Sequence, residues 1–279
     1  MRLLTWNIQW GLGMDGRVDL ARIVRHAREI GDPDVICLQE VSDGMSDLDG
    51  NDGADQFAAI ARLLPGYHAI AGTGVETYGE AGERRRFGNM ILSRLPVRQV
   101  LRHQLPWPGA AGMNMPRMLI ETSIVAPFGP VRVMTTHLEY FSAGLRASAV
   151  KAIRNVHADA CSRETTPRQA GSGPYVVQPG SRSAILTGDF NMRPEDPTRL
   201  RLLEPFPDAT PAFVDAWTAR NGGTPQPPSF CIADQRYGEP HCADYVLVTA
   251  DLASRVADVL YDIETRLSDH QPVVLVIEN

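Results

Sequence analysis

Short apolar runs, several of them ending in a polar residue, alternate along the chain with segments of helical periodicity. Each run is short enough for one strand, and most are bounded by turn-forming or charged residues. We therefore expect strands at 3–8, 35–39, 90–93, 118–125, 131–137, 184–187, 244–248 and 272–277.

Two segments between these runs place apolar residues on one helical face. Residues 18–30 do so with Val18, Ile23 and Ala27, and residues 147–161 do so with Val150 and Ile153. Three other segments carry the Gly, Pro and Asp residues typical of loops. They begin at Ser42, with helix resuming at Asp55, and span 105–116 and 166–183.

The alternation of strands and helices predicts an α/β fold rather than an all-β sandwich. No internal repeat or clean linker divides the sequence. We expect one domain over residues 1–279.

Composition and charge exclude some classes of function. The chain has 279 residues, a net charge of -6 and a pI near 5.6, which argue against a broadly basic nucleic-acid-binding protein. The four cysteines form no CxxC pair, and neither a signal peptide nor a long apolar run is evident. We expect a reduced, cytoplasmic protein without a transmembrane anchor, acting as a monomer.

Polar residues gather at the borders of the expected strands. Such residues in an α/β fold meet in the crevice beyond the strand ends. Each alone has an ordinary structural explanation as a turn residue, a cap or a hydrogen-bonded histidine, but turn chemistry does not explain the whole set. They are Asn7, Glu40, His137, Asp189, Asn191, Asp244, Asp269 and His270.

The residue types favour one chemistry. Glu40 and Asp269 offer the hard oxygen ligands that suit Mg²⁺ or Mn²⁺. The chain lacks the HExxH motif of zinc hydrolases, the GxSxG elbow of serine esterases and the P-loop of NTPases. Of these hydrolytic reactions, metal-assisted attack of water on a phosphoester is the one that the residues still allow.

Six short motifs carry a family resemblance. TWNIQ, LQEV, GNMILSR, TTHLE, GDFN and SDHQPV occur in that order over nearly the whole chain. The sequence resembles the endonuclease/exonuclease/phosphatase superfamily, which has the DNase I-like fold. The resemblance implies a four-layer α/β sandwich, with two packed β-sheets flanked by helices, and a divalent-metal-dependent phosphoester hydrolase that uses Mg²⁺ or Mn²⁺.

Position by position, the resemblance also implies roles on the metal side of the site. Glu40 matches the principal metal ligand, and Asn7 lies beside the metal and the phosphate. Asp269 matches a second metal-proximal carboxylate. His270 matches the histidine that contacts the scissile phosphate, and Asp244 holds that histidine.

The remaining roles concern water and the leaving group. By the same resemblance, Asp189 orients or deprotonates the attacking water, and Asn191 donates a hydrogen bond to the phosphate. His137 binds phosphate or assists the leaving group. The resemblance leaves open whether Asp189 or His270 is the base.

The substrate is not fixed by these motifs. Arg117 opens a strand near the site and is a candidate for substrate binding, whereas Arg84 to Arg86 form either a phosphate-binding patch or a solvated charge run. The phosphoester is a small molecule, a phospholipid head group or a nucleic acid. A DNA repair or processing nuclease and a noncatalytic phosphate-ligand binding protein are the alternatives.

Overall fold

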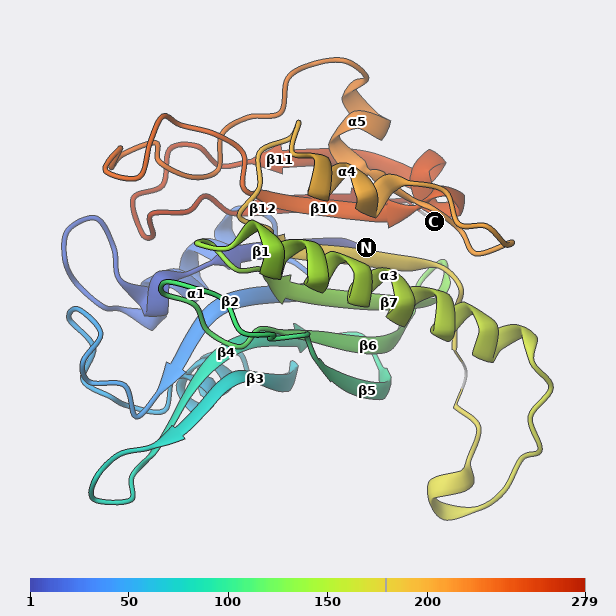
Figure 1. Ribbon diagram of the computed structural model, residues 1–279, viewed down its shortest axis with the longest axis horizontal. Helices are drawn as coiled ribbons and strands as arrows, with labels where there is room; N and C mark the ends of the chain where they lie inside the picture. Colours follow the sequence, from blue (N-terminus) through green and yellow to red (C-terminus); the bar gives the residue numbers. More distant parts are fainter. Residues whose placement is uncertain (179, 279) are drawn as a thin grey trace.

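The computed structural model describes residues 1–178 and 180–278, and over these residues two six-stranded β-sheets pack face to face (Figure 1). The first sheet has the order β11 (Val256–Tyr261), β12 (Val273–Ile277), β1 (Arg2–Asn7), β2 (Val35–Asp43), β4 (Arg84–Ser93) and β3 (His68–Tyr78). The second has the order β5 (Val97–Gln104), β6 (Met118–Ala126), β7 (Gly129–His137), β8 (Ala184–Asp189), β10 (Asp244–Thr249) and β9 (Phe213–Asp215).

Helices and short 3-10 turns connect these strands. They are α1 (Leu20–Glu29), α2 (Gln56–Leu63), α3 (Ala143–Thr165), α4 (Pro197–Leu203), α5 (Ala216–Asn221), η1 (Gln9–Gly11), η2 (Gly173–Tyr175) and η3 (Ala250–Arg255). Each α-helix begins at a side chain that accepts a hydrogen bond from a backbone N–H of the first turn, and these caps are Asp19, Asp55, Ser142, Asp196 and Asp215 for α1 to α5.

The central strands are buried on both faces, which explains their nearly continuous apolar sequences. Along β1, Leu3 packs between the two sheets, whereas Leu4 packs against the cluster that includes Ile23 of α1 and Phe57 of α2. On the other side, Val150 of α3 packs against the second sheet. The result is a four-layer α/β sandwich, as expected (Figure 1).

The structure confirms the eight expected strands and adds β3, β5, β9 and β11, which the sequence analysis missed. The two helices expected at 18–30 and 147–161 are α1 and α3. The second is longer than expected because Ser142 caps it one turn earlier. The cysteines are free and buried at all four positions.

In the part of the chain that the structure describes, no helix has both the length and the apolar character that a membrane crossing requires.

Candidate active site

Strand register brings three of the expected residues side by side at one end of the second sheet. Asp189 on β8 is paired with His137 on the parallel strand β7 and with Asp244 on the antiparallel strand β10. All three side chains are almost fully buried. Their proximity follows directly from the register, because direct partners on adjacent strands project to the same face.

Gly188 allows β8 to approach β7 at this point. Its φ of +136° lies in a region that L-residues rarely adopt, and a Cβ atom at this position would meet the carbonyl oxygen of Thr136 at 1.8 Å. Asn191 and Glu40 also have positive φ angles, 51° and 60°. Glu40 occupies the irregularity in the pairing of β2 with β4. Unusual backbone conformations of this kind often accompany functional sites.

Asn7 links the two sheets at the site. The side-chain amide of Asn7, at the end of β1, donates hydrogen bonds of 3.0 Å to Glu40 Oε1 and 3.0 Å to Asp189 Oδ2. Its oxygen accepts a hydrogen bond from the backbone N–H of Gln9. In this orientation Asn7 holds two carboxylates together as a donor, and its role as a metal ligand stays a prediction.

His270 is held by Asp244. The His270 Nδ1 atom lies 2.8 Å from Asp244 Oδ2, which also accepts a hydrogen bond from Ser229 Oγ at 2.7 Å. The other ring nitrogen of His270, Nε2, lies 3.5 Å from Asp189 Oδ2. Trp6 Nε1 donates to the His270 carbonyl oxygen. The ring is thus fixed between two carboxylates.

The carboxyl groups of this cluster are difficult to ionise together. Burial, followed by the charge of Asp269, raises the pKa of Glu40 to about 7. Burial likewise raises the pKa of Asp269. Burial and the charge of Asp244 raise the pKa of Asp189 to about 6, although His270 opposes this shift. A cation at Glu40 and Asp269 would relieve this repulsion.

The two histidines of the site have opposite protonation preferences. Burial alone would lower the pKa of His270, but the charges of Asp244 and Asp189 raise it well above its usual value. Burial and the positive charge of Arg117 lower the pKa of His137. The two pKa shifts favour the imidazolium form of His270 and the neutral form of His137.

Asn191 is bonded to His137. The side-chain amide of Asn191 donates to His137 Nε2 at 3.0 Å and to the carbonyl oxygen of Leu138 at 3.0 Å, while its backbone N–H donates to Asp189 Oδ1. The expected role of Asn191 as a phosphate donor requires this amide to exchange one of these partners, and that role stays a prediction.

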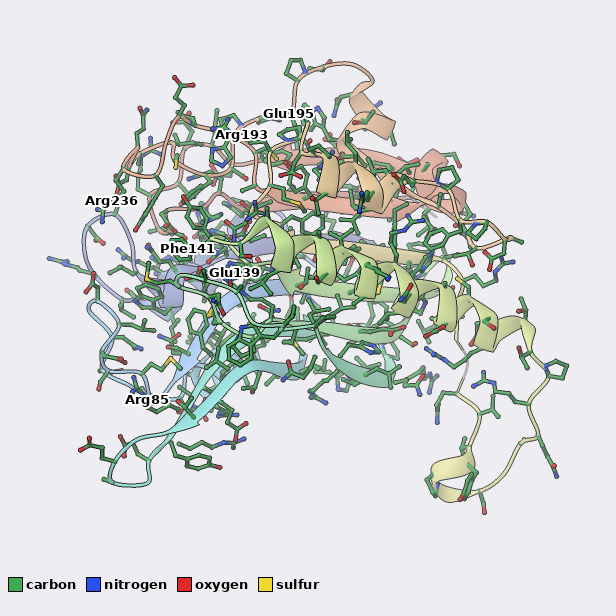
Figure 2. All side chains as sticks on the ribbon, in the orientation of Figure 1. Arg85, Glu139, Phe141, Arg193, Glu195 and Arg236 are labelled. Carbon is green, nitrogen blue, oxygen red and sulfur yellow. The ribbon has the colours of Figure 1, made fainter. Side chains whose placement is uncertain are left out.

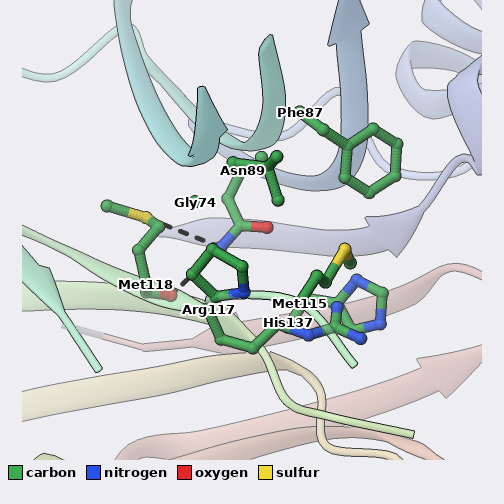
Figure 3. Close-up of a pocket in the computed structure, with 10 residues that line it drawn as sticks. Gly74, Phe87, Asn89, Met115, Arg117, Met118 and His137 are labelled. Carbon is green, nitrogen blue, oxygen red and sulfur yellow. Dashed lines mark hydrogen bonds between the residues drawn. The ribbon is translucent and has the colours of Figure 1, made fainter. Parts of the chain in front are cut away.

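Arg117 lies beside His137 at the edge of the site, where a small pocket opens between them and Asn89 (Figure 3). Its Nε atom is 3.2 Å from Glu139 Oε2, whereas the buried Nη1 atom has no hydrogen-bond partner among the described residues. This unpaired N–H group is suited to an anionic oxygen.

A second group of residues could also bind a metal. Within the described chain, Asp189, Asp244 and His270 place ligand atoms within 4.8 Å of one another. Asp244 Oδ2 is already occupied by His270 and Ser229. This cluster is therefore better suited to holding a proton than a cation.

The site opens into a cleft of about 420 Å³. Its polar lining includes Glu40, His137, Asp189, Asn191, Asp269 and His270, together with Arg117. Asn7 and Asp244 support these residues from behind. The rest of the lining is largely apolar and aromatic, and the sequence analysis missed most of it. Phe141, which lines the cleft, lies near Glu139 at one end of the sandwich (Figure 2).

Arg84 to Arg86 do not line this cleft. They form the first residues of β4, and each is ion-paired: Arg84 with Glu76, Arg85 with Asp47, and Arg86 with Asp43 and Asp55. These carboxylates neutralise the run, so it offers little charge to a phosphate chain.

The fold is that of a DNase I-like protein. The family model described as "Endonuclease/Exonuclease/phosphatase family" matches residues 4–270, and the chain belongs to this family. Its members are generally hydrolases of phosphoesters and typically use divalent metals. No curated protein matched the chain.

Solved structures share the fold. An endonuclease/exonuclease/phosphatase from Beutenbergia cavernae is 24% identical, with a TM-score of 0.64, over 99% of this chain and 70% of that one. A family protein from Leptotrichia buccalis is 14% identical, with a TM-score of 0.68, over the full length of both chains. A mannosyl-6-phosphatase from Bacteroides thetaiotaomicron is 14% identical, with a TM-score of 0.63, over the full length of both.

Proposed function

We propose that the protein is a divalent-metal-dependent phosphoester hydrolase in which an activated water attacks phosphorus. The observation that carries this proposal is the position of Asp189. Its carboxylate lies between the amide of Asn7 and the imidazole of His270, at the floor of an open cleft. A carboxylate with a pKa of about 6 is well matched to accepting a proton near neutral pH.

Glu40 and Asp269 are the residues that would hold the metal. Both are carboxylates, both line the cleft, and the charge of Asp269 raises the pKa of Glu40. This donor set fits Mg²⁺ or Mn²⁺. When bound, the metal would supply Lewis-acid stabilisation of negative charge on the phosphoryl oxygens.

Side chains of the protein would activate the water, bind the phosphoryl oxygens and assist the leaving group. Asp189 accepts the proton of the attacking water, and His270, kept protonated by Asp244, donates a hydrogen bond to a phosphoryl oxygen. The free Nη1 of Arg117 binds a second oxygen. His137, neutral and held by Asn191, lies next to Asp189 and assists departure of the leaving group.

Charge in the cleft argues for a small substrate over a polynucleotide. Among the described residues that line it, Arg117 is the one arginine or lysine, and it is paired with Glu139. A nuclease needs several cations along the phosphate backbone. The related mannosyl-6-phosphatase carries an activity of this small-molecule kind in its name.

A metal-dependence experiment tests the proposal. The purified protein is assayed with Mg²⁺ or Mn²⁺ against a phosphodiester, a phosphomonoester, abasic-site DNA and a phosphoinositide, before and after chelation. Calorimetry then measures Mn²⁺ affinity in Glu40→Gln, with Glu29→Gln on the exposed face of α1 as the control. We expect activity that chelation abolishes and a loss of affinity in Glu40→Gln alone. Undiminished activity after exhaustive chelation contradicts the proposal.

A further inference from the structure

A continuous series of aromatic rings leads from His270 to the rim of the cleft. Phe230 stacks on His270 with ring centroids 4.4 Å apart and an interplanar angle of 21°, and Tyr237 stacks on Phe230 at 6.1 Å and 20°. Tyr140 then meets Tyr237 edge-on at 6.0 Å, and Phe141 meets Tyr140 edge-on at 4.9 Å. We call these four residues, Phe230, Tyr237, Tyr140 and Phe141, the aromatic wall.

The aromatic wall changes from buried to exposed along its length. Phe230 is 5% exposed, whereas Tyr237 is 54% and Phe141 is 58% exposed. Burial of Phe230 explains how the ring of His270 is supported, but support does not require exposed rings at the rim. Large aromatic side chains left open to water beside a polar cluster are typical of a ligand-binding surface.

The cleft has further apolar lining besides the aromatic wall. It includes Trp10 and Leu48, which come from the connections after β1 and β2. Trp10 has an unusual φ of 44°, and its Nε1 donates to the carbonyl oxygen of Asp49, so its ring is fixed. A cleft of about 420 Å³ is far larger than a phosphate group needs and lies in the range of small organic ligands.

We infer that the cleft binds the organic part of the substrate as a planar aromatic ring, placed against the aromatic wall while the phosphate lies at Asp189 and His270. This inference rests on the proposed function and names its substrate class: a small phosphoester with one aromatic substituent. Ring faces and edges favour another ring over a flexible alkyl chain, which must lose rotamer freedom on binding. The scarcity of cations in the cleft disfavours a polyanion.

Binding of simple phosphate monoesters tests the inference, and it is measured in the Asp189→Asn background, where hydrolysis of the esters is slow. Calorimetry in Mg²⁺ compares phenyl phosphate, methyl phosphate and hexyl phosphate, the last with a flexible apolar chain. We expect phenyl phosphate to bind about tenfold or more tightly than methyl phosphate, and more tightly than hexyl phosphate. The aromatic assignment is overturned if either hexyl phosphate or methyl phosphate binds as tightly as phenyl phosphate.

Variants of the aromatic wall test where the phenyl ring of the ligand binds. Tyr237→Leu and Phe141→Leu keep an apolar side chain but remove the ring, and each should bring the phenyl-to-methyl affinity ratio towards one. Tyr175→Leu is the matched control, because Tyr175 is 77% exposed in η2, at the other end of the sandwich (Figure 1). Since each ratio is measured within one variant, a general loss of stability does not imitate the effect. A ratio unchanged in both wall variants overturns the inference.

An oligonucleotide and a turnover assay complete the design. A short single-stranded DNA that binds more tightly than phenyl phosphate, with steep salt dependence, overturns the small-substrate assignment. Absence of metal-dependent hydrolysis of every ester by the wild type contradicts the proposed function, whereas equal binding of phenyl and methyl phosphate, together with hydrolysis by the wild type, contradicts the aromatic wall alone. The two failures are thus distinguishable.

Discussion

Asp189 and Asp244 are direct partners across β8 and β10, but they meet His270 on opposite ring nitrogens. Asp244 lies 2.8 Å from Nδ1, within hydrogen-bond distance, whereas Asp189 lies 3.5 Å from Nε2 and faces the cleft. Two chemically identical side chains on adjacent strands therefore have different tasks. Asp244 fixes the charge and orientation of the imidazole, and Asp189 remains available to water.

Asp244→Asn should lower the pKa of His270, because it removes the carboxylate that does most to raise it. The imidazolium is then lost as pH rises through a lower value, so the basic limb of the kcat/KM profile should move to lower pH. We expect activity at pH 7 to fall about 10²-fold or more. Imidazole titration by NMR measures the shift directly.

Ser229→Ala is the matched control for this variant. It removes the hydroxyl that donates to Asp244 Oδ2 but keeps the carboxylate, so the basic limb should move less than in Asp244→Asn. Equal shifts in the two variants would mean that the hydrogen-bond network, and not the charge of Asp244, controls His270.

The polar residues of the site could be predicted from the sequence, but the aromatic residues that line the rest of the cleft could not. Glu40, Asp189 and His270 follow or precede continuous apolar runs, so pattern and motif order predicted them together. The aromatic wall was not predictable, because Tyr140 and Tyr237 lie far apart in the chain and meet only through the folding of two loops. The sequence signals were Tyr140 and Phe141, which are adjacent in one loop, and single aromatic residues at Phe230 and Tyr237.

The missed strands have a similar explanation. β3 and β5 are edge strands with many exposed positions, and they lack the continuous apolar run that marks β1 or β8. β9 has only three residues. Their positions are determined by pairing with a neighbour, as when β3 pairs along β4, and such pairing leaves little trace in local sequence.

Gly188→Ala should destabilise the protein through a direct collision with the backbone of Thr136. Gly129→Ala is a control with a similarly positive φ, +116°, but no atom lies within 4 Å of the added Cβ. Both variants introduce backbone strain, and overpacking should cost Gly188→Ala about 1–3 kcal/mol more. Urea unfolding measures both. Equal losses in the free energy of unfolding for the two variants would show that β7 and β8 can move apart at this point without destabilising the protein.

His157 should make the protein sensitive to acid. It is fully buried on α3, accepts from Arg132 Nη2 at Nδ1 and donates from Nε2 to the Pro211 carbonyl oxygen. Burial and the charge of Arg132 lower its pKa to about 4, from 6.5. Because the unfolded chain binds the proton more readily, the stabilisation is complete above pH 6.5 and is lost as pH falls towards 4.

The linkage between proton binding and unfolding puts the loss in the free energy of unfolding at about 3 kcal/mol. Urea unfolding of the wild type at pH 7, 6, 5 and 4 should show the decline, and His157→Gln should show a shallower one. His68→Gln, at an exposed position of β3, is the control and should follow the wild type. Parallel pH curves for wild type and His157→Gln would mean that other groups cause the acid sensitivity.

Asp189→Asn separates catalysis from turn formation at the centre of the site. The wild-type carboxylate accepts from Asn7 Nδ2 and from the Asn191 N–H, so the amide loses one of these bonds but also removes a buried charge. The melting temperature should change little. Without a group to accept the proton of water, kcat should fall about 10²–10⁴-fold.

The matched control is Asp196→Asn. Asp196 caps α4 by accepting from the Thr198 N–H, a position where Asn serves as well as Asp, so neither stability nor turnover should change. Were Asp189 also a turn residue after Gly188, the two variants would behave alike. Thermal melting together with turnover on an accepted phosphoester therefore decides between the two roles. A folded Asp189→Asn protein with near wild-type kcat would remove the proton acceptor from the proposed mechanism.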